Sequence, residues 1–283
     1  MTINGVLQIS IYLLVLILLV KPLGGYMAHV YAGERTFLDR LLRPVERLLY
    51  RATGIDPAQE MNWKTYAIAM LAFNALGILM LYGLQRLQGV LPFNPQNLGT
   101  VSPDLAFNTA VSFGTNTNWQ NYSGEVTQSY LTQMLGMTVQ NFLSAGTGMA
   151  ILVALIRGIV RNSANTIGNY WVDLIRSVVY ILLPLSMLLS LALVSQGVVQ
   201  TFQGAQPVAL LQPFKDTNGL LIDQQILAVG PAASQIAIKQ LGTNGGGFFN
   251  TNSAHPFENP TPLANFLEML SILLIPAALC YTY

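Results

Sequence analysis

Uncharged apolar segments of membrane-spanning length limit what this chain can fold into more than any other feature does. A helix needs about 20 mainly apolar residues to cross about 30 Å of hydrocarbon. No basic residue precedes the first such segment and Lys21 follows it, so we expect a retained helix and not a cleaved secretory signal. Five spans are expected: 1–20, 65–85, one within 126–156, 177–195 and 263–283.

Charged residues are too few to cover a water-soluble protein of this size. The length of 283 residues suggests two soluble domains, but only 9% of the residues are charged, against roughly 25% in soluble proteins. The net charge of +1 gives no electrostatic footprint for nucleic acid. A single cysteine, Cys280, cannot form an internal disulfide, and the distant His29 and His255 lack metal-ligand spacing. The composition therefore predicts a membrane protein.

The basic residues are distributed unevenly along the chain. Ten of the 13 Lys and Arg residues flank or occupy two connections, between the first and second spans and between the third and fourth. Positively charged connections remain on the cytoplasmic side of a membrane. We therefore expect an extracytoplasmic N-terminus, with the long connections 86–125 and 196–260 facing outward.

Residues 36–50, in the first basic connection, form an amphipathic segment. Apolar residues recur at helical spacing with arginines between them: Leu38, Leu41, Leu42, Val45, Leu48 and Leu49. Two interpretations remain open. The segment is either a helix at the cytoplasmic membrane surface, with its arginines near anionic headgroups, or a short helix packed on the other helices.

One tripeptide occurs at equivalent places in the two outward connections. Gly-Thr-Asn stands at 114–116 and again, 128 residues later, at 242–244. Each copy follows a short, mostly uncharged segment, at 104–113 and at 232–241, with a proline just before it. We expect these segments to be half-helices, so that the order helix, half-helix, polar loop, helix occurs twice.

The repeated arrangement suits a cation. The C-terminal end of a half-helix carries about −0.5 of an elementary charge, and the loop leading back must be buried in protein or line water. Inward-turned carbonyls and hydroxyls can replace the hydration shell of a cation, and glycines 245–247 permit the positive φ values that this requires. Divalent cations usually recruit carboxylates, which both tripeptide segments lack, so the chemistry favours K⁺ and leaves Na⁺ open.

Three strings around these tripeptides resemble one family of transport proteins. They are Thr115-Asn-Thr-Asn-Trp-Gln120, Leu241-Gly-Thr-Asn-Gly-Gly-Gly-Phe-Phe-Asn250 and Ser253-Ala-His-Pro-Phe-Glu-Asn-Pro-Thr261. Along its whole length the chain resembles the potassium-binding A subunit of the bacterial Kdp potassium-transporting ATPase. The resemblance implies an all-α membrane protein of the superfamily whose pore is built from four helix–pore-loop–helix units.

The organisation that the resemblance implies has five parts. They are a leading transmembrane helix at 1–24, a basic cytoplasmic segment at 25–61, a first pore unit at 62–157, a cytoplasmic linker at 158–176 and a second pore unit at 177–283. Family members have four units and this chain contains two, which is half of the pore. We therefore expect a fragment, or a chain whose remaining pore walls come from another chain.

The resemblance also implies a K⁺ filter lined by both loops. Its expected residues are Thr115, Asn116, Thr117, Asn118, Thr243, Asn244 and Gly245, with Gln120, Gly114, Gly242 and Gly246 as less direct contributors. K⁺ is then the transported ion, taken from the extracytoplasmic side of the bacterial inner (plasma) membrane. The sequence has no Gly-Lys-Ser/Thr motif for nucleotide. ATP hydrolysis is therefore expected from a P-type ATPase subunit, with small accessory subunits and membrane lipid as further partners.

Several alternatives remain open from the sequence. The chain could instead be a self-sufficient secondary K⁺ or Na⁺ transporter of the same superfamily, or a non-conducting fragment or scaffold. Glu125 and Glu258 either concentrate cations at the outer mouth or cap helices. Glu268, inside the last span, either lies on the ion path or pairs with a neighbouring helix. We interpret His255 as a structural turn residue.

Overall fold

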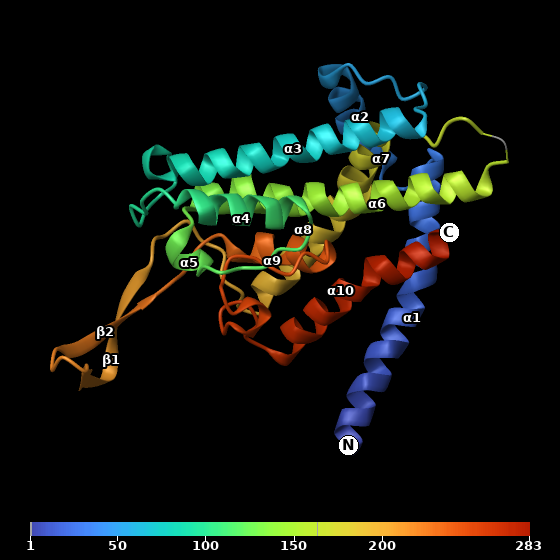
Figure 1. Cartoon of the computed structure of the whole chain (residues 1–283). Coiled ribbons are helices and arrows are strands. Elements are labelled where there is room, and N and C mark those ends of the chain that lie inside the picture. Colours follow the sequence, from blue (N-terminus) through green and yellow to red (C-terminus); the bar gives the residue numbers. More distant parts are fainter. Residues whose placement is uncertain (1, 163) are drawn as a thin grey trace.

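Helices dominate the structure, a computed structural model that describes residues 2–162 and 164–283 (Figure 1). The α-helices are α1 (Ile3–Ala32), α2 (Asp39–Thr53), α3 (Trp63–Leu87), α4 (Pro103–Gly114), α5 (Gly124–Thr127), α6 (Val139–Val160), α7 (Tyr170–Arg176), α8 (Leu183–Ser195), α9 (Ala232–Leu241) and α10 (Pro262–Thr282). Short 3-10 turns are η1 (Gln88–Val90) and η4 (Asn252–Ala254), and π-helical segments are η2 (Thr132–Thr138) and η3 (Ser177–Leu182). Two strands, β1 (Gln206–Lys215) and β2 (Leu221–Leu227), form an antiparallel hairpin.

Five helical segments in the described part of the chain are long and apolar enough to cross a membrane. They are Ile3–Ala32, Trp63–Val90, Thr132–Val160, Tyr170–Ser195 and Pro262–Thr282. Large apolar side chains such as Leu14, Leu71 and Leu191 face outward from them, as expected where lipid replaces water around the protein. The predicted helical membrane fold is confirmed.

The fourth span starts earlier than the sequence predicted. Helix begins at Tyr170 and not near residue 177, so it occupies part of the predicted linker 158–176. This stretch contains the charged residues Asp173 and Arg176. In the structure both charges are paired with residues of other helices, so the helix can contain them.

Capping residues fix where the long helices begin and end. The hydroxyl of Thr2 accepts a hydrogen bond from the N–H of Gly5 at the start of α1. This helix continues beyond the predicted limit at residue 24 as far as Ala32, where Gly33 adopts a left-handed φ of 74°. Asn62 caps α3 and Thr261 caps α10 by the same side-chain contact to a backbone N–H three residues on.

Pro184 lies inside the fourth span, and a neighbouring helix compensates for it. Proline has no N–H and cannot donate to a carbonyl of the preceding turn. That turn is the π-helical segment η3, where the N–H of Leu183 donates to the carbonyl of Val178, five residues earlier. The hydroxyl of Tyr26 on α1 donates to the carbonyl of Tyr180 in this segment at 2.9 Å, so a neighbouring helix supports the turn before the proline.

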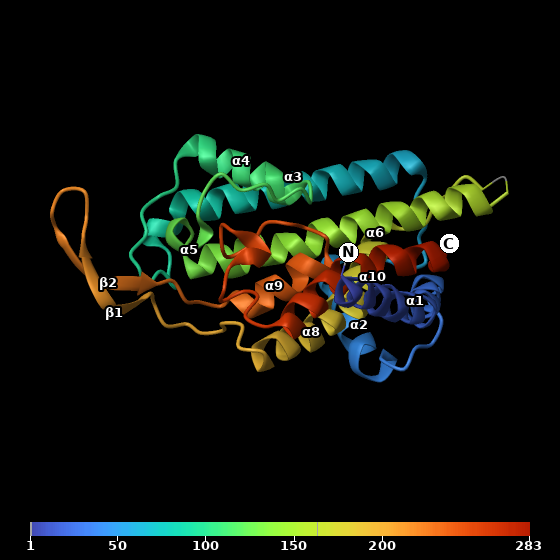
Figure 2. The same cartoon turned by 90° about the horizontal axis from the view of Figure 1, so that it is seen from below.

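The two predicted half-helices are present as α4 and α9. The sequence placed them at 104–113 and 232–241, and the structure has them at Pro103–Gly114 and Ala232–Leu241. Figures 1 and 2 show α4 alongside one half of α3 and α6, while α9 packs between α8 and α10. Neither short helix reaches the other end of the long helices.

The β-hairpin was not predicted from the sequence. Figures 1 and 2 show it projecting beyond the helices, at the end opposite that where α6 stops. The pairing register shifts between Ala209 and Phe214, and most residues of both strands are exposed. The hairpin therefore adds a small extended element to one of the two long connections.

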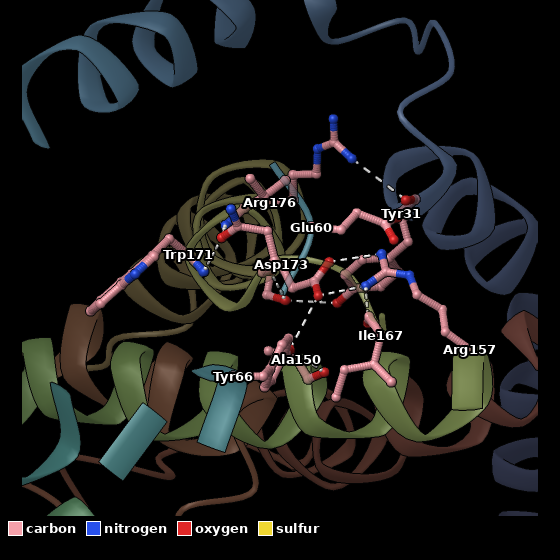
Figure 3. A network of polar contacts seen from close by, with 12 residues as sticks. Tyr31, Glu60, Tyr66, Ala150, Arg157, Ile167, Trp171, Asp173 and Arg176 are labelled. Carbon is pink, nitrogen blue, oxygen red and sulfur yellow. Dashed lines mark hydrogen bonds and ion pairs between the residues drawn. The ribbon is translucent and has the colours of Figure 1, made fainter. Parts of the chain in front are cut away.

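The two basic connections meet at one end of the molecule (Figure 1), which we call the basic end. Figure 3 shows part of it from close by, with Glu60, Arg157 and Arg176 labelled. Arg161 pairs with Glu60 at 2.8 Å, and Arg176 pairs with Glu46 at 3.2 Å. Hydrogen bonds from Arg161 and then from Thr166 lower the pKa of Glu60 to about 2. These contacts fasten the first basic connection to the second.

Helix α2 packs on the bundle through one face. Glu46 is buried on that face and accepts hydrogen bonds from the hydroxyls of Tyr50 and Tyr180. Leu41 and Leu48 remain exposed on the rest of the helix. Of the two interpretations that the sequence left open, the structure supports the packed helix, which keeps an exposed apolar side.

Candidate functional site

The C-terminal ends of α4 and α9 each lead into a polar segment that turns back. We call residues 115–120 the first return segment and residues 242–247 the second return segment. The N–H groups of residues 115–118 donate to carbonyls of Val111, Ser112 and Phe113 in the last turns of α4, at 2.9 to 3.3 Å. The backbone N–H groups of residues 115–118 are therefore all bonded to the half-helix that precedes them.

The second return segment repeats this backbone pattern. The N–H groups of residues 242–244 donate to carbonyls of Ile238, Lys239 and Gln240 in the last turn of α9, at 2.7 to 3.1 Å. Both segments therefore sit at the C-terminal end of a helix, where the helix dipole is negative. Two such ends close together favour a cation between them.

The two return segments contact each other directly. The side-chain amide of Asn116 donates to the carbonyl of Gly242 at 3.1 Å, and Asn244 donates to the side-chain oxygen of Asn116. Further along, Asn118 donates to the carbonyl of Gly246 at 3.3 Å. Two of these three contacts join residues 128 positions apart, so the repeat offset of the sequence is also a spatial pairing.

Helix α6 holds both segments from behind. Asn118 donates to the side-chain oxygen of Asn141 at 2.7 Å, and the hydroxyl of Ser144 donates to Asn116 at 2.7 Å. Asn244 also reaches the Ser144 hydroxyl at 3.2 Å. The sequence interpretation missed these two α6 residues, although polar side chains three positions apart in an apolar span were a signal.

The predicted filter residues divide into two groups in the structure. Asn118 and Asn244 are buried and Asn116 is half-buried, and all three face the other segment or α6. The other group is exposed on the opposite side and consists of Thr115, Thr117, Thr243 and Gly245. The asparagines thus fasten the segments together, while the threonines and the glycine present an uncovered side.

Backbone carbonyls of both segments remain without a hydrogen bond inside the chain. Among residues 2–162 and 164–283, no hydrogen bond ends on the carbonyl oxygens of residues 115–118 or 243–245. The hydroxyls of Thr115 and Thr117 lie 3.0 Å apart on the same stretch. The site therefore offers neutral oxygens, which are the ligands expected for a monovalent cation.

Glycine is required at two positions of the second return segment. Gly245 has a φ of 108°, which side chains rarely adopt. A Cβ atom on Gly246 would overlap the carbonyl oxygen of Asn118 in the first return segment. The close approach of the two segments therefore depends on the absence of a side chain at Gly246.

The remaining predicted contributors lie at the ends of the same contact. Gln120 forms a pair of hydrogen bonds with the backbone of Gly247, donating at 2.9 Å and accepting at 3.1 Å. Gly114 is buried at the end of α4 against Ile78 of α3. The carbonyl of Gly242 already accepts from Asn116, so this residue belongs to the contact between the segments.

A cavity lies beside the two return segments, among α6, η3, α9 and α10. Its volume is about 140 Å³, and its lining includes Asn116, Thr243, Met149 and Ile275. A space of this size can hold water molecules. It adjoins the filter candidates at the end of the two half-helices.

The glutamates predicted to flank the filter have other contacts. Glu258 is fully buried and pairs with Lys239, so the prediction that it attracts cations at an exposed mouth or caps a helix is wrong. Glu125 accepts the backbone N–H of Asn250 at 3.1 Å and so joins the two outward connections. Glu268 accepts a hydrogen bond from Gln240 of α9 at 2.8 Å, which is the pairing alternative.

His255 stabilises the loop that follows the second return segment. Its ring stacks on Phe249 with a centroid distance of 3.8 Å, and it accepts the backbone N–H of Phe257 at 3.1 Å. Burial lowers the pKa of His255, although the carboxylate of Glu125 opposes that change. These contacts agree with its interpretation as a structural turn residue.

Comparison with protein families gives one match that covers almost the whole chain. The family model described as potassium-transporting ATPase A subunit, KdpA, matches residues 10–283. The chain belongs to this family. Together with the five apolar helices, this membership indicates a multi-pass membrane protein.

Curated relatives agree with the family and are longer. The chain is 67% identical over 280 residues to the potassium-transporting ATPase potassium-binding subunit of Herpetosiphon aurantiacus, covering 99% of this chain and 48% of the relative. It is 66% identical over 283 residues to the protein of the same name from Sorangium cellulosum, covering 100% and 49%. A relative in Methylococcus capsulatus is 60% identical over 303 residues, covering 100% and 51%. The chain spans about half the length of these relatives.

Proposed function

We propose that this chain forms two of the pore walls of a potassium-binding subunit in an ATP-driven K⁺ uptake complex. The observation that carries the proposal is the contact between the two return segments, with their backbone N–H groups turned into the half-helices. Carbonyls of residues 115–118 and 243–245 are then available as ligands. The printed names of the relatives supply the ion and the type of complex.

Selection of K⁺ would follow from the chemistry of these oxygens. A K⁺ ion that enters the filter exchanges its water shell for carbonyl and threonine oxygens on the uncovered side of the two segments. The negative ends of α4 and α9 stabilise the ion without a carboxylate in the filter. Asn116, Asn118 and Asn244 would act indirectly, because they fix the spacing between the two sets of carbonyls.

The proposed orientation places the basic end in the cytoplasm and the N-terminus outside. It is supported by the paired arginines at that end, Arg157, Arg161 and Arg176, and by the positive-inside rule. K⁺ would then enter from the hairpin side of the bacterial plasma membrane. A P-type catalytic subunit would hydrolyse ATP, with small accessory subunits beside it.

The proposal can be tested with two asparagines of the same connection. Asn116→Ala removes the contacts to Gly242 and Ser144, so the K⁺ concentration for half-maximal ATP hydrolysis by the complete complex should rise about tenfold, as for a loss of about 1.4 kcal/mol. Asn121→Ala changes an exposed side chain in the same connection and should leave that concentration unchanged.

Three results would contradict the proposed function. ATP hydrolysis by the unaltered complex that does not depend on K⁺ would exclude a K⁺-binding subunit of a pump. Rubidium flux that is driven by a gradient in liposomes, without ATP and without a partner, would favour the secondary transporter. If Asn116→Ala and Asn121→Ala change the half-maximal K⁺ concentration equally, the first return segment is not part of the filter.

A further inference from the structure

A buried group of charged and polar side chains lies directly behind the second return segment. Lys239 of α9 pairs with Glu258 of the following loop, and these side chains are 1% and 0% exposed. The hydroxyl of Ser253 is within 3.4 Å of both partners. Burying two charges completely is costly, so the presence of this pair needs a physical explanation.

The same group connects three elements around the half-helix. Gln240, next to Lys239, donates to Ser253 at 2.7 Å and to Glu268 of α10 at 2.8 Å. The contacts therefore join α9 to the 252–258 loop and to the last span. This arrangement fixes the half-helix from the side that faces away from the first return segment.

Lys239 also supports the second return segment with both its backbone and its side chain. Its carbonyl accepts the N–H of Asn244 at 3.0 Å. A Cβ atom on Gly247 would lie only 2.8 Å from the Cδ of Lys239, so the Lys239 side chain packs beside this glycine. The carbonyl and N–H of Gly247 are bonded in turn to Gln120 of the first return segment.

Stability alone does not account for this pair. Removing two charges from water costs much of what their attraction returns, and apolar residues of similar volume often serve a fold as well or better. A fully buried pair can instead fix the position of the segment that it contacts, because each charge restricts where its partner can lie. The position of Lys239, one turn before the second Gly-Thr-Asn, places that restriction at the filter.

We infer that Lys239 and Glu258 are positioning residues that set the ion affinity of the second return segment. They neither line the filter nor touch the ion. Their ion pair, with Ser253 between its partners, holds Asn244 and Gly247 at the distance from the first return segment that the ion requires. The inference rests on the proposed function and assigns part of its selectivity to residues outside the Gly-Thr-Asn motifs.

The test compares single and double substitutions in the complete complex. Lys239→Met and Glu258→Gln each leave one member of the ion pair without its partner, whereas the double variant Lys239→Met/Glu258→Gln removes both members and leaves the buried Glu268 with its hydrogen bond from Gln240. In the double variant the K⁺ concentration for half-maximal ATP hydrolysis should rise about tenfold, because small displacements of ligand groups weaken binding steeply. The maximal rate at saturating K⁺ should stay within about twofold of the unaltered complex, and the preference for K⁺ over Na⁺ should fall.

The matched control is Lys215→Met in the exposed hairpin. Lys215 is the same residue type in the same connection and is exposed, so its half-maximal K⁺ concentration should not change. A milder variant, Ser253→Ala, removes the hydroxyl that contacts both members of the pair and accepts from Gln240, and it should raise the half-maximal concentration at least about threefold. If the double variant does not fold, the half-maximal K⁺ concentration of Ser253→Ala tests the inference instead.

The outcomes separate the inference from the proposed function. If the unaltered complex shows no K⁺-dependent hydrolysis, the proposed function fails and the inference fails with it. If the unaltered complex responds to K⁺ but the folded double variant has the same half-maximal concentration and the same preference, only the inference is overturned. A lower maximal rate at an unchanged half-maximal concentration would likewise overturn it, because that pattern indicates a purely structural pair.

Discussion

Within each Gly-Thr-Asn copy, the asparagine and the threonine face different surroundings. Asn116 and Asn244 reach across to the opposite segment and to Ser144, while Thr115 and Thr243 are exposed on the other side. An amide side chain can donate and accept at once, so it can tie two backbones that have used their own N–H groups elsewhere. This division explains why a short neutral tripeptide suffices to join the two loops.

Gly246 should tolerate no side chain. A Cβ atom there overlaps the carbonyl of Asn118, so Gly246→Ala must push the two return segments apart. We expect K⁺ affinity to fall about tenfold or more, because the ligand oxygens move away from their common spacing. K⁺-dependent ATP hydrolysis by the complete complex is the measurement.

Gly83→Ala is the control for this substitution. Gly83 lies in α3, and a Cβ atom there meets no other group within 4 Å. Its K⁺ affinity should be that of the unaltered complex. Unchanged affinity in Gly246→Ala as well would show that the segments are not held at contact distance.

The sequence predicted the places of the two return segments better than it predicted the contacts of their residues. The repeated tripeptide located both return segments, because its spacing and its flanking half-helices are visible in the chain. The ties to Asn141 and Ser144, and the pairing of Lys239 with Glu258, were missed. These contacts join residues from different elements, and their geometry is set only when the helices pack.

Among the elements, the half-helices depend on burial for their stability. A helix of ten residues is marginal by itself in water, yet nine of the ten residues of α9 are buried in the structure. Tertiary contacts therefore maintain it. Its position was nevertheless predictable, because a proline precedes it and a glycine follows its mostly uncharged pattern.

Two other elements were harder to predict. The early start of the fourth span was missed because Asp173 and Arg176 carry charge, and only the fold shows that Arg157 and Glu46 pair with them. The hairpin was missed although Asn218-Gly219 between its strands is a common turn sequence. Attention to turn sequences in long connections would have indicated it.

The packing of α1 on α10 gives a prediction with adjacent residues as target and control. A Cβ atom on Gly24 would lie 2.6 Å from the carbonyl oxygen of Ala278 and 2.8 Å from the Cβ of Tyr281, whereas one on Gly25 would have its nearest neighbour at 3.9 Å. Gly24→Ala should destabilise the protein by about 1–3 kcal/mol. Gly25→Ala should be neutral or slightly stabilising, because alanine favours helix.

Thermal unfolding in detergent measures both variants. Equal midpoints for Gly24→Ala and Gly25→Ala would show that α1 and α10 are not in contact at this place. A lower midpoint for Gly24→Ala alone is the expected result.

On the scale of the whole molecule, ion pairs at the basic end join α7 to α6 and to α2 (Figure 3). Arg157 of α6 forms two hydrogen bonds with Asp173 of α7, at 2.6 and 2.8 Å. Tyr66 of α3 donates to the same carboxylate and to the carbonyl of Ala150. The helices α3, α6 and α7 therefore meet at one buried carboxylate.

Burial should decide how much each of these pairs contributes. The side chain of Asp173 is 1% exposed, whereas Glu60, the partner of Arg161, is 39% exposed. Arg157→Gln should destabilise the protein by about 3–5 kcal/mol, because it leaves a buried carboxylate without its partner. Arg161→Gln should cost at most about 1 kcal/mol, as is usual for exposed pairs.

Detergent-unfolding midpoints of these two variants provide the comparison. A larger loss for Arg161→Gln than for Arg157→Gln would mean that Asp173 is accessible to water. Such a result would contradict the packing of the basic end.

The unbonded carbonyls of the two return segments have a consequence for how such a protein is made. Lipid tails offer no hydrogen bonds, and each peptide oxygen left facing them costs several kcal/mol. During synthesis and membrane insertion, the carbonyls of residues 115–118 and 243–245 must therefore remain hydrated or be buried by other parts of the protein. Biogenesis has to keep acyl chains away from the carbonyl oxygens of both return segments.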